Sequence, residues 1–79
     1  IAPQVVVADD RIVILWTESR GPVSESFYMV LTAEGDVITP ATSLGGLKLN
    51  SYEMPIYHDG LVYWVYAYNG NLRVASIKP

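Results

Sequence analysis

The sequence predicts an all-β chain of antiparallel strands, and three observations support this class. A short apolar run, a turn with aspartate and a longer apolar run occur in this order twice, over Pro3–Thr17 and Pro55–Tyr66. The two copies, superposed on Asp10 and Asp59, lie 49 residues apart. No segment keeps the 3.6-residue period of an amphipathic helix for three turns. We therefore expect two related β units and no helix longer than one turn.

Alternation and turn residues predict four strands in the first unit, which spans about 3–49: Gln4–Ala8, Ile12–Thr17, Ser26–Ala33 and Asp36–Thr39. Asp9-Asp10 joins the first pair of strands and Glu34-Gly35 the last pair. The polar segment Glu18–Ser24, which contains Gly21-Pro22, is expected to be a loop. Pro40–Asn50 has no clear period and is expected to be a second loop.

The second unit, about 50–79, predicts three strands: Tyr52–His58, Leu61–Tyr68 and Asn71–Lys78. Asp59-Gly60 and Asn69-Gly70 are strong signals for tight hairpin turns. Pro55 interrupts the first of these strands and must sit where no ladder donor is needed. This unit lacks a fourth strand, so its last strand should present an unpaired edge.

Ile12–Thr17 and Leu61–Tyr68 are apolar on both faces, which is typical of strands in sheets that are covered on both sides. Trp16 and Trp64 lie in these strands and are expected to be largely buried. Two units can cover each other on only one face. We therefore expect a partner polypeptide or a homo-oligomer, since 79 residues without cysteine supply little surplus stability.

Composition excludes several classes of function. The absence of cysteine excludes disulfides, thiolate zinc sites and a cysteine nucleophile. A net charge of −3 disfavours nucleic acid as a partner, and no apolar run approaches the length of a membrane span. The chain begins with Ile1, so we expect processing from a longer protein, with a secreted, periplasmic or cell-surface location. No cofactor is predicted.

Candidate catalytic and metal-binding residues all have a structural interpretation that we favour. His58 and Asp59 are neighbours in sequence and so point to opposite faces of a strand. Asp9, Asp10 and Asp36 could ligate a hard cation, but each is expected at a turn, where aspartate is favoured for its backbone hydrogen bonds. Glu18 and Glu53 are the one carboxylate pair considered for glycoside hydrolysis. No catalytic or metal-binding residue is predicted.

The pattern of strands and turns resembles the repeats of bacterial β-propellers of the sialidase-like and WD40-like surface type. The matching pieces are Pro3–Ala8, Asp9-Asp10, Ile12–Thr17, Phe27-Tyr28, Ala33–Asp36, Pro55, Asp59-Gly60, Leu61–Tyr66 and Asn69-Gly70. The resemblance implies about two propeller-like blades, the second without its outer strand. It also implies ligand-facing loops at Glu18–Ser24, Pro40–Tyr52 and Asn69-Gly70.

The residues that we predict for binding are polar or aromatic side chains in or beside those loops: Glu18, Arg20, Tyr52, Glu53, Tyr66, Tyr68 and Asn69. Aromatic rows can stack on sugars, so a carbohydrate is one candidate ligand, although the same residues could pack one sheet on another. The leading interpretation is a non-catalytic binding or assembly segment of a processed β-propeller protein. The alternatives are a small proteolytic subunit of a glycan-acting propeller hydrolase and a free-standing small β-sandwich.

Overall fold

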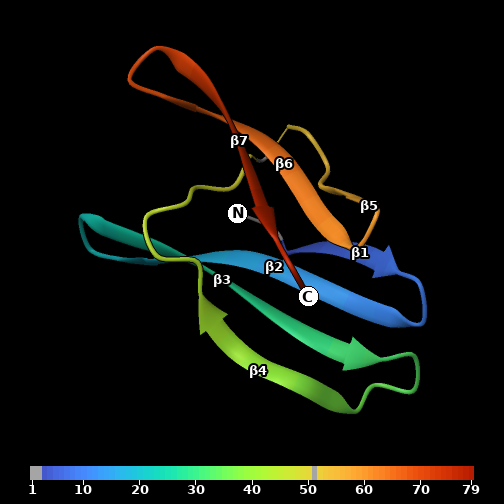
Figure 1. Cartoon of the computed structure of the whole chain (residues 1–79). Coiled ribbons are helices and arrows are strands. Elements are labelled where there is room, and N and C mark those ends of the chain that lie inside the picture. The colour runs from blue at the N-terminus through green and yellow to red at the C-terminus, as the bar shows by residue number, and fades with distance from the viewer. Residues whose placement is uncertain (1–2, 51) are drawn as a thin grey trace.

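Seven β-strands form two open antiparallel sheets in the computed structural model, which describes residues 3–50 and 52–79 (Figure 1). Sheet A has the order β1-β2-β3-β4, with bounds Gln4–Ala8, Arg11–Arg20, Val23–Thr32 and Val37–Ser43. Sheet B has the order β5-β6-β7, with bounds Ile56–His58, Leu61–Tyr68 and Asn71–Ile77. The prediction of an all-β chain with four strands and then three is confirmed. The described residues contain no helix.

Tight two-residue turns join the strands of sheet B. Asp59 and Gly60 have φ angles of 50° and 85°, and Asn69 and Gly70 have 50° and 75°. Positive φ at both central residues is the signature of the type I′ turn, whose twist matches that of the flanking strands. The dipeptides Asp59-Gly60 and Asn69-Gly70 therefore behave as the sequence predicts.

The loop predicted at Glu18–Ser24 is wrong. β2 continues to Arg20, β3 begins at Val23, and only Gly21-Pro22 separate them. Gly21 has φ 62°, which suits the first central position of a type II′ turn, and proline fits the second because its φ is fixed near −65°. The polar residues on both sides pair across the strands, and Thr17 Oγ1 and Ser26 Oγ lie 2.9 Å apart.

Two further predicted boundaries move. β4 passes through Pro40 and ends at Ser43, so the first part of the predicted Pro40–Asn50 loop is strand. Between the pairs Tyr28–Thr42 and Val30–Thr39, β3 has one residue and β4 has two, one of which is Pro40. This bulge lets an edge strand carry a proline. The strand predicted over Tyr52–His58 is reduced to Ile56–His58, directly after the buried Pro55.

The hydrophobic core lies between the two sheets and is closed by the segment that connects them. Sheet A supplies mainly aliphatic side chains and sheet B larger ones: Val6, Ala8, Val13, Leu15, Val30, Val62, Trp64, Tyr66 and Ala75. The connecting segment, residues 44–55, adds Leu44 and Leu49. The Trp64 indole Nε1 donates a hydrogen bond of 2.6 Å to the carbonyl of Lys48, which fixes this segment against the core.

The first hairpin of sheet A (β1-β2) and that of sheet B (β5-β6) correspond at their turns. Ala8 pairs with Arg11 and His58 with Leu61, each pair flanking a two-residue turn. Equivalent residues of the two hairpins are therefore 50 positions apart. The superposition of Asp10 on Asp59, which predicts an offset of 49, is wrong by one residue. The turn of one hairpin lies beside the turn of the other, where Tyr57 Oη donates a hydrogen bond of 2.8 Å to Asp9 Oδ2.

The two hairpins use opposite faces for the shared core. In β2 the buried residues are Val13 and Leu15, whereas in β6 they are Val62, Trp64 and Tyr66. With an offset of 50, the buried residues of β6 are equivalent to residues 12, 14 and 16 of β2, which lie on the opposite face from Val13 and Leu15. The two hairpins are therefore stacked one on the other, with one face of the first against the opposite face of the second. The sheets approach most closely at β1 and β5 (Figure 1).

Candidate functional site

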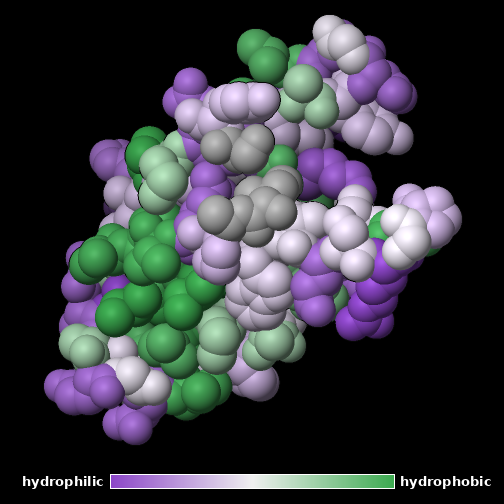
Figure 2. Space-filling view, turned by 180° about the vertical axis from the view of Figure 1, so that it is seen from behind, coloured by the Kyte–Doolittle hydropathy of each residue, from purple (hydrophilic) through white to green (hydrophobic). Residues whose placement is uncertain are grey.

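The outer face of sheet A, which does not face the core, is apolar. Alternation along three strands places eight large hydrophobic side chains on it: Val5, Val7, Ile12, Ile14, Trp16, Phe27, Met29 and Leu31. Val5 and Val7 are 52% and 69% exposed, and the others are partly exposed. The space-filling view shows hydrophobic side chains gathered over this sheet (Figure 2). We call these eight residues the A outer face.

Two aromatic rings on the A outer face stack on each other. The ring centroids of Trp16 and Phe27 are 5.8 Å apart, with 22° between the ring planes. Trp16 is only partly buried, so the prediction that it is largely buried is not met, whereas Trp64 is buried as predicted. The difference arises because Trp16 lies on the outer face of its sheet and Trp64 on the core face.

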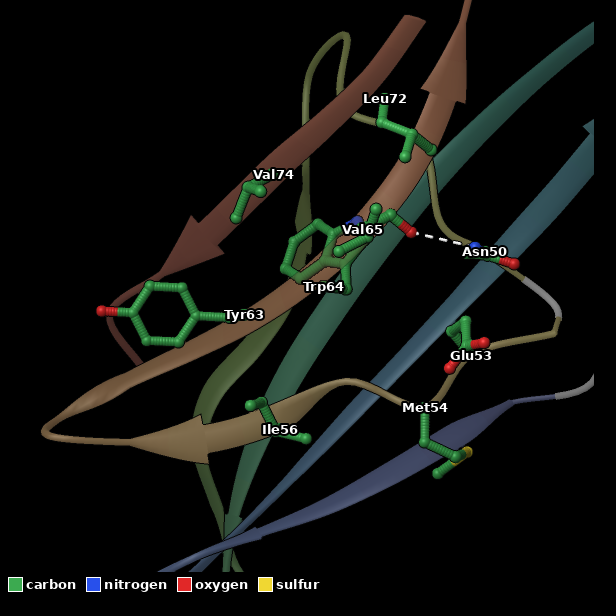
Figure 3. Close-up of a pocket in the computed structure, with 9 residues that line it drawn as sticks. All are labelled: Asn50, Glu53, Met54, Ile56, Tyr63, Trp64, Val65, Leu72 and Val74. Carbon is green, nitrogen blue, oxygen red and sulfur yellow. Dashed lines mark hydrogen bonds between the residues drawn. The ribbon is translucent and has the colours of Figure 1, made fainter.

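Sheet B also has an apolar outer face, and this face is hollowed. Its large side chains are Ile56, Tyr63, Val65, Leu72 and Val74, which we call the B outer face. They line a cavity of about 510 Å³ whose remaining wall comes from Asn50, Glu53, Met54 and Trp64 (Figure 3). Leu72 is 80% exposed. Sequence reasoning missed this hollow, although the alternation of Leu72 and Val74 was a usable signal.

A buried glutamine holds the polar wall of that cavity in place. Gln4 on β1 is 7% exposed, and its Nε2 donates hydrogen bonds of 3.0 Å to the carbonyl of Asn50 and 3.3 Å to that of Glu53. The Asn50 side chain donates to the carbonyl of Val65 at 3.0 Å (Figure 3). Gln4 Oε1 is buried without a hydrogen-bond partner in the described residues. The connecting segment is therefore fixed to both sheets.

A second, polar cleft lies where the turns of the two hairpins meet. Asp9, Asp10, Arg11, Tyr57 and Lys78 are among the residues that line it. The hydrogen bond to Asp9 raises the pKa of the Tyr57 phenol, and desolvation and the Asp9 charge add to the shift. This cleft joins the two units and mixes both signs of charge.

The residues predicted for binding are spread over the surface. Glu18 and Arg20 are exposed near the end of β2, and their charged groups are 3.8 Å apart. Tyr52, which is 94% exposed, and the buried Tyr66 line one shallow hollow of about 320 Å³. Glu53 lies instead at the cavity of the B outer face.

The two remaining candidates lie together at the β6–β7 turn. Tyr68 is 46% exposed, and the guanidinium carbon of Arg73 lies 5.1 Å from the centre of its ring. Asn69 has φ 50° in the turn itself. The hairpin turn at Gly21-Pro22 is at the same end of the molecule but in the other sheet (Figure 1). The predicted binding residues thus occupy several sites rather than one.

The aspartates that could ligate a metal ion lie at or beside turns. Asp9 and Asp59 occupy turn positions with positive φ, and the backbone carbonyl of Asp36 accepts a hydrogen bond from the Thr32 amide. Within residues 3–50 and 52–79, no three histidine or acidic side chains are grouped to hold a metal ion. In the same ranges, no helix has the length and apolarity needed to cross a bilayer.

Comparisons with protein-family models, with curated proteins and with solved structures found no match for this chain. The features of the structure that indicate a function are the two apolar outer faces and the relation between the hairpins.

Proposed function

We propose that this chain is a non-catalytic assembly segment whose two sheets are blade-like units of a larger β-propeller-type stack. In such a stack, other sheets cover the outer faces of sheets A and B. The A outer face is the observation that carries the proposal. Soluble monomers rarely expose contiguous apolar patches larger than a few hundred Å², and larger ones mark interaction sites.

The relation between the hairpins supports the same function. Propellers repeat four-stranded sheets radially, so each sheet packs one face on the preceding sheet and the other face on the next. The buried faces of β2 and β6 are opposite, as such a repeat requires. The sheets also approach most closely at β1 and β5, which are equivalent strands. A sandwich that stood alone would instead have polar residues on its outer faces.

The accessible surface and the radius of gyration of the chain are both larger than expected for a compact monomer, as for a chain whose sheets have faces that no other sheet covers. Its accessible surface is 5183 Å², whereas a compact monomer of 8.7 kDa is expected to expose about 4700 Å². Its radius of gyration is 12.5 Å, compared with about 11.6 Å expected for 79 residues. The excess surface is the size of a patch that a neighbouring sheet could cover.

Sedimentation velocity on the isolated chain, from about 1 to 100 μM, tests this function. We expect a sedimentation coefficient that rises with concentration, together with binding of a hydrophobic dye at the lowest concentration. A folded monomer over the whole range that binds no dye would contradict the assembly function and favour the free-standing sandwich.

A further inference from the structure

The two free faces of the molecule are equivalent to the two faces that already pack together in its core. With an offset of 50, Ile12, Ile14 and Trp16 of the A outer face correspond to Val62, Trp64 and Tyr66, which are the core face of sheet B. The A outer face of sheet A is therefore equivalent to the core face of sheet B. In the core of the molecule, that face of sheet B packs on the core face of sheet A.

The same relation holds for the other free face. Tyr63 and Val65 of the B outer face correspond to Val13 and Leu15, which are the core face of sheet A. The core of the molecule is thus an interface between two different kinds of sheet face. One face of each kind remains free, namely the A outer face and the B outer face. A second copy of the chain would present the counterpart that each free face lacks.

We infer that a second copy docks its B outer face onto the A outer face of the first, so that copies assemble head to tail. This inference rests on the proposed assembly function and names the partner and the faces. The central residues of both faces are uncharged, as in the cores of protein interfaces. An interface between unlike faces closes into a ring where the rotation permits and otherwise extends as a filament.

Shape agrees with this pairing. The B outer face is hollowed by the cavity of about 510 Å³, whereas the A outer face carries the stacked rings of Trp16 and Phe27. Large aromatic side chains that fill apolar pockets are the usual anchors of protein interfaces. A symmetric pairing of two B outer faces would leave two hollows opposite each other.

Two variants that each spoil one face test the inference. Ile14→Asp places a charge at the centre of the A outer face, and Val65→Asp places one at the cavity of the B outer face. Ser19→Asp is the matched control, because it adds the same charge to β2 at an exposed residue near the end of the strand, away from the A outer face. Circular dichroism and tryptophan fluorescence establish that each variant is folded, and Ile14→Ser and Val65→Ser replace any variant that is not.

We expect each face variant alone to self-associate at least about tenfold more weakly than the natural chain, with Ser19→Asp unchanged. An equimolar mixture of Ile14→Asp and Val65→Asp should form a dimer of one copy of each and nothing larger. The intact B outer face of the first variant then meets the intact A outer face of the second.

Other outcomes overturn the inference. Self-association of one face variant at the natural strength would show a symmetric pairing of the face that remains intact. A mixture in which the two folded variants stay monomeric would also overturn the head-to-tail inference. If the natural chain still self-associates in that case, the proposed assembly function is not contradicted. A natural chain that is a folded monomer at about 100 μM and binds no hydrophobic dye would overturn both.

Discussion

The central strands β2 and β6 have the same position in their hairpins and a similar apolar pattern, but they stabilise the core in different ways. Both follow a two-residue turn and carry apolar side chains on both faces. β2 contributes Val13 and Leu15, which are fully buried and purely aliphatic, whereas β6 contributes Trp64 and Tyr66, whose rings end in polar groups. The core residues of β2 therefore contribute packing alone, whereas β6 is also held by the hydrogen bond from Trp64 to the connecting segment.

The largest effect that the comparison predicts is at Leu15. Leu15→Ala should lower the free energy of unfolding by about 2–5 kcal/mol, because it leaves a cavity at a fully buried site. A chain of this size has about 4–12 kcal/mol in total. The neighbouring Ile14→Ala on the outer face is the control and should cost less in the monomer. Urea denaturation followed by tryptophan fluorescence measures both, and equal losses would contradict the assignment of the two faces.

Gln4 provides the next test, because it joins sheet A to the connecting segment. Gln4→Glu replaces an amide donor with a carboxylate that faces the carbonyls of Asn50 and Glu53, and should cost about 2–3 kcal/mol at pH 7. Burial should raise the pKa of the new carboxyl, so the loss should shrink as the pH falls to about 4 and the group binds a proton. Gln4→Leu cannot ionise and is the control. A loss that does not change with pH would contradict this account.

How much the connecting segment stabilises sheet B is measured at Trp64. Trp64→Phe removes the hydrogen bond to the carbonyl of Lys48 and part of a buried ring, and should cost about 1–2 kcal/mol. Trp16→Phe makes the same change on the A outer face and should cost less than about 1 kcal/mol, because Trp16 is partly exposed. Thermal unfolding by circular dichroism compares them. Equal costs would show that the Lys48 contact does not stabilise the fold.

The smallest effect is expected at the contact between the hairpin turns. Tyr57→Phe removes the hydrogen bond to Asp9 at the exposed end of the molecule. The pKa of Tyr57 is raised in the folded chain, so its stabilisation is present below about pH 10 and is lost as the pH rises through the folded pKa. The difference in the free energy of unfolding between Tyr57→Phe and the natural chain should therefore be larger at pH 7 than at about pH 11.

The parts of the fold that could be predicted from sequence are those with local causes. The Asp59-Gly60 and Asn69-Gly70 turns and the apolar strands beside them require only nearby residues. The ends of β2 and β3 could not be predicted, because their polar side chains are held by pairing across the strands rather than by burial. The full length of β4 could not be predicted, because proline normally ends a strand and only a bulge at the sheet edge lets β4 continue through Pro40.

The candidate surfaces could be predicted only in part, for a different reason. The two-sided apolar pattern of Ile12–Thr17 and Leu61–Tyr68 indicated that sheets should lie on both faces. Which face stays free is decided by how the two sheets stack, and that depends on contacts between distant parts of the chain. The cavity of the B outer face likewise needs the connecting segment, which Gln4 fixes through residues 46 and 49 positions away.

The order of strands in each sheet also has a consequence for folding. Within each sheet every strand pairs with the next strand in the sequence, and four of the five connections are two-residue turns next to paired residues. Such short loops close quickly, so each sheet can form without waiting for the other. During synthesis, residues 4–43 are complete before β5 leaves the ribosome. We therefore expect the late, slow event to be the docking of sheet B, with mutations at Trp64 acting mainly on the unfolding rate.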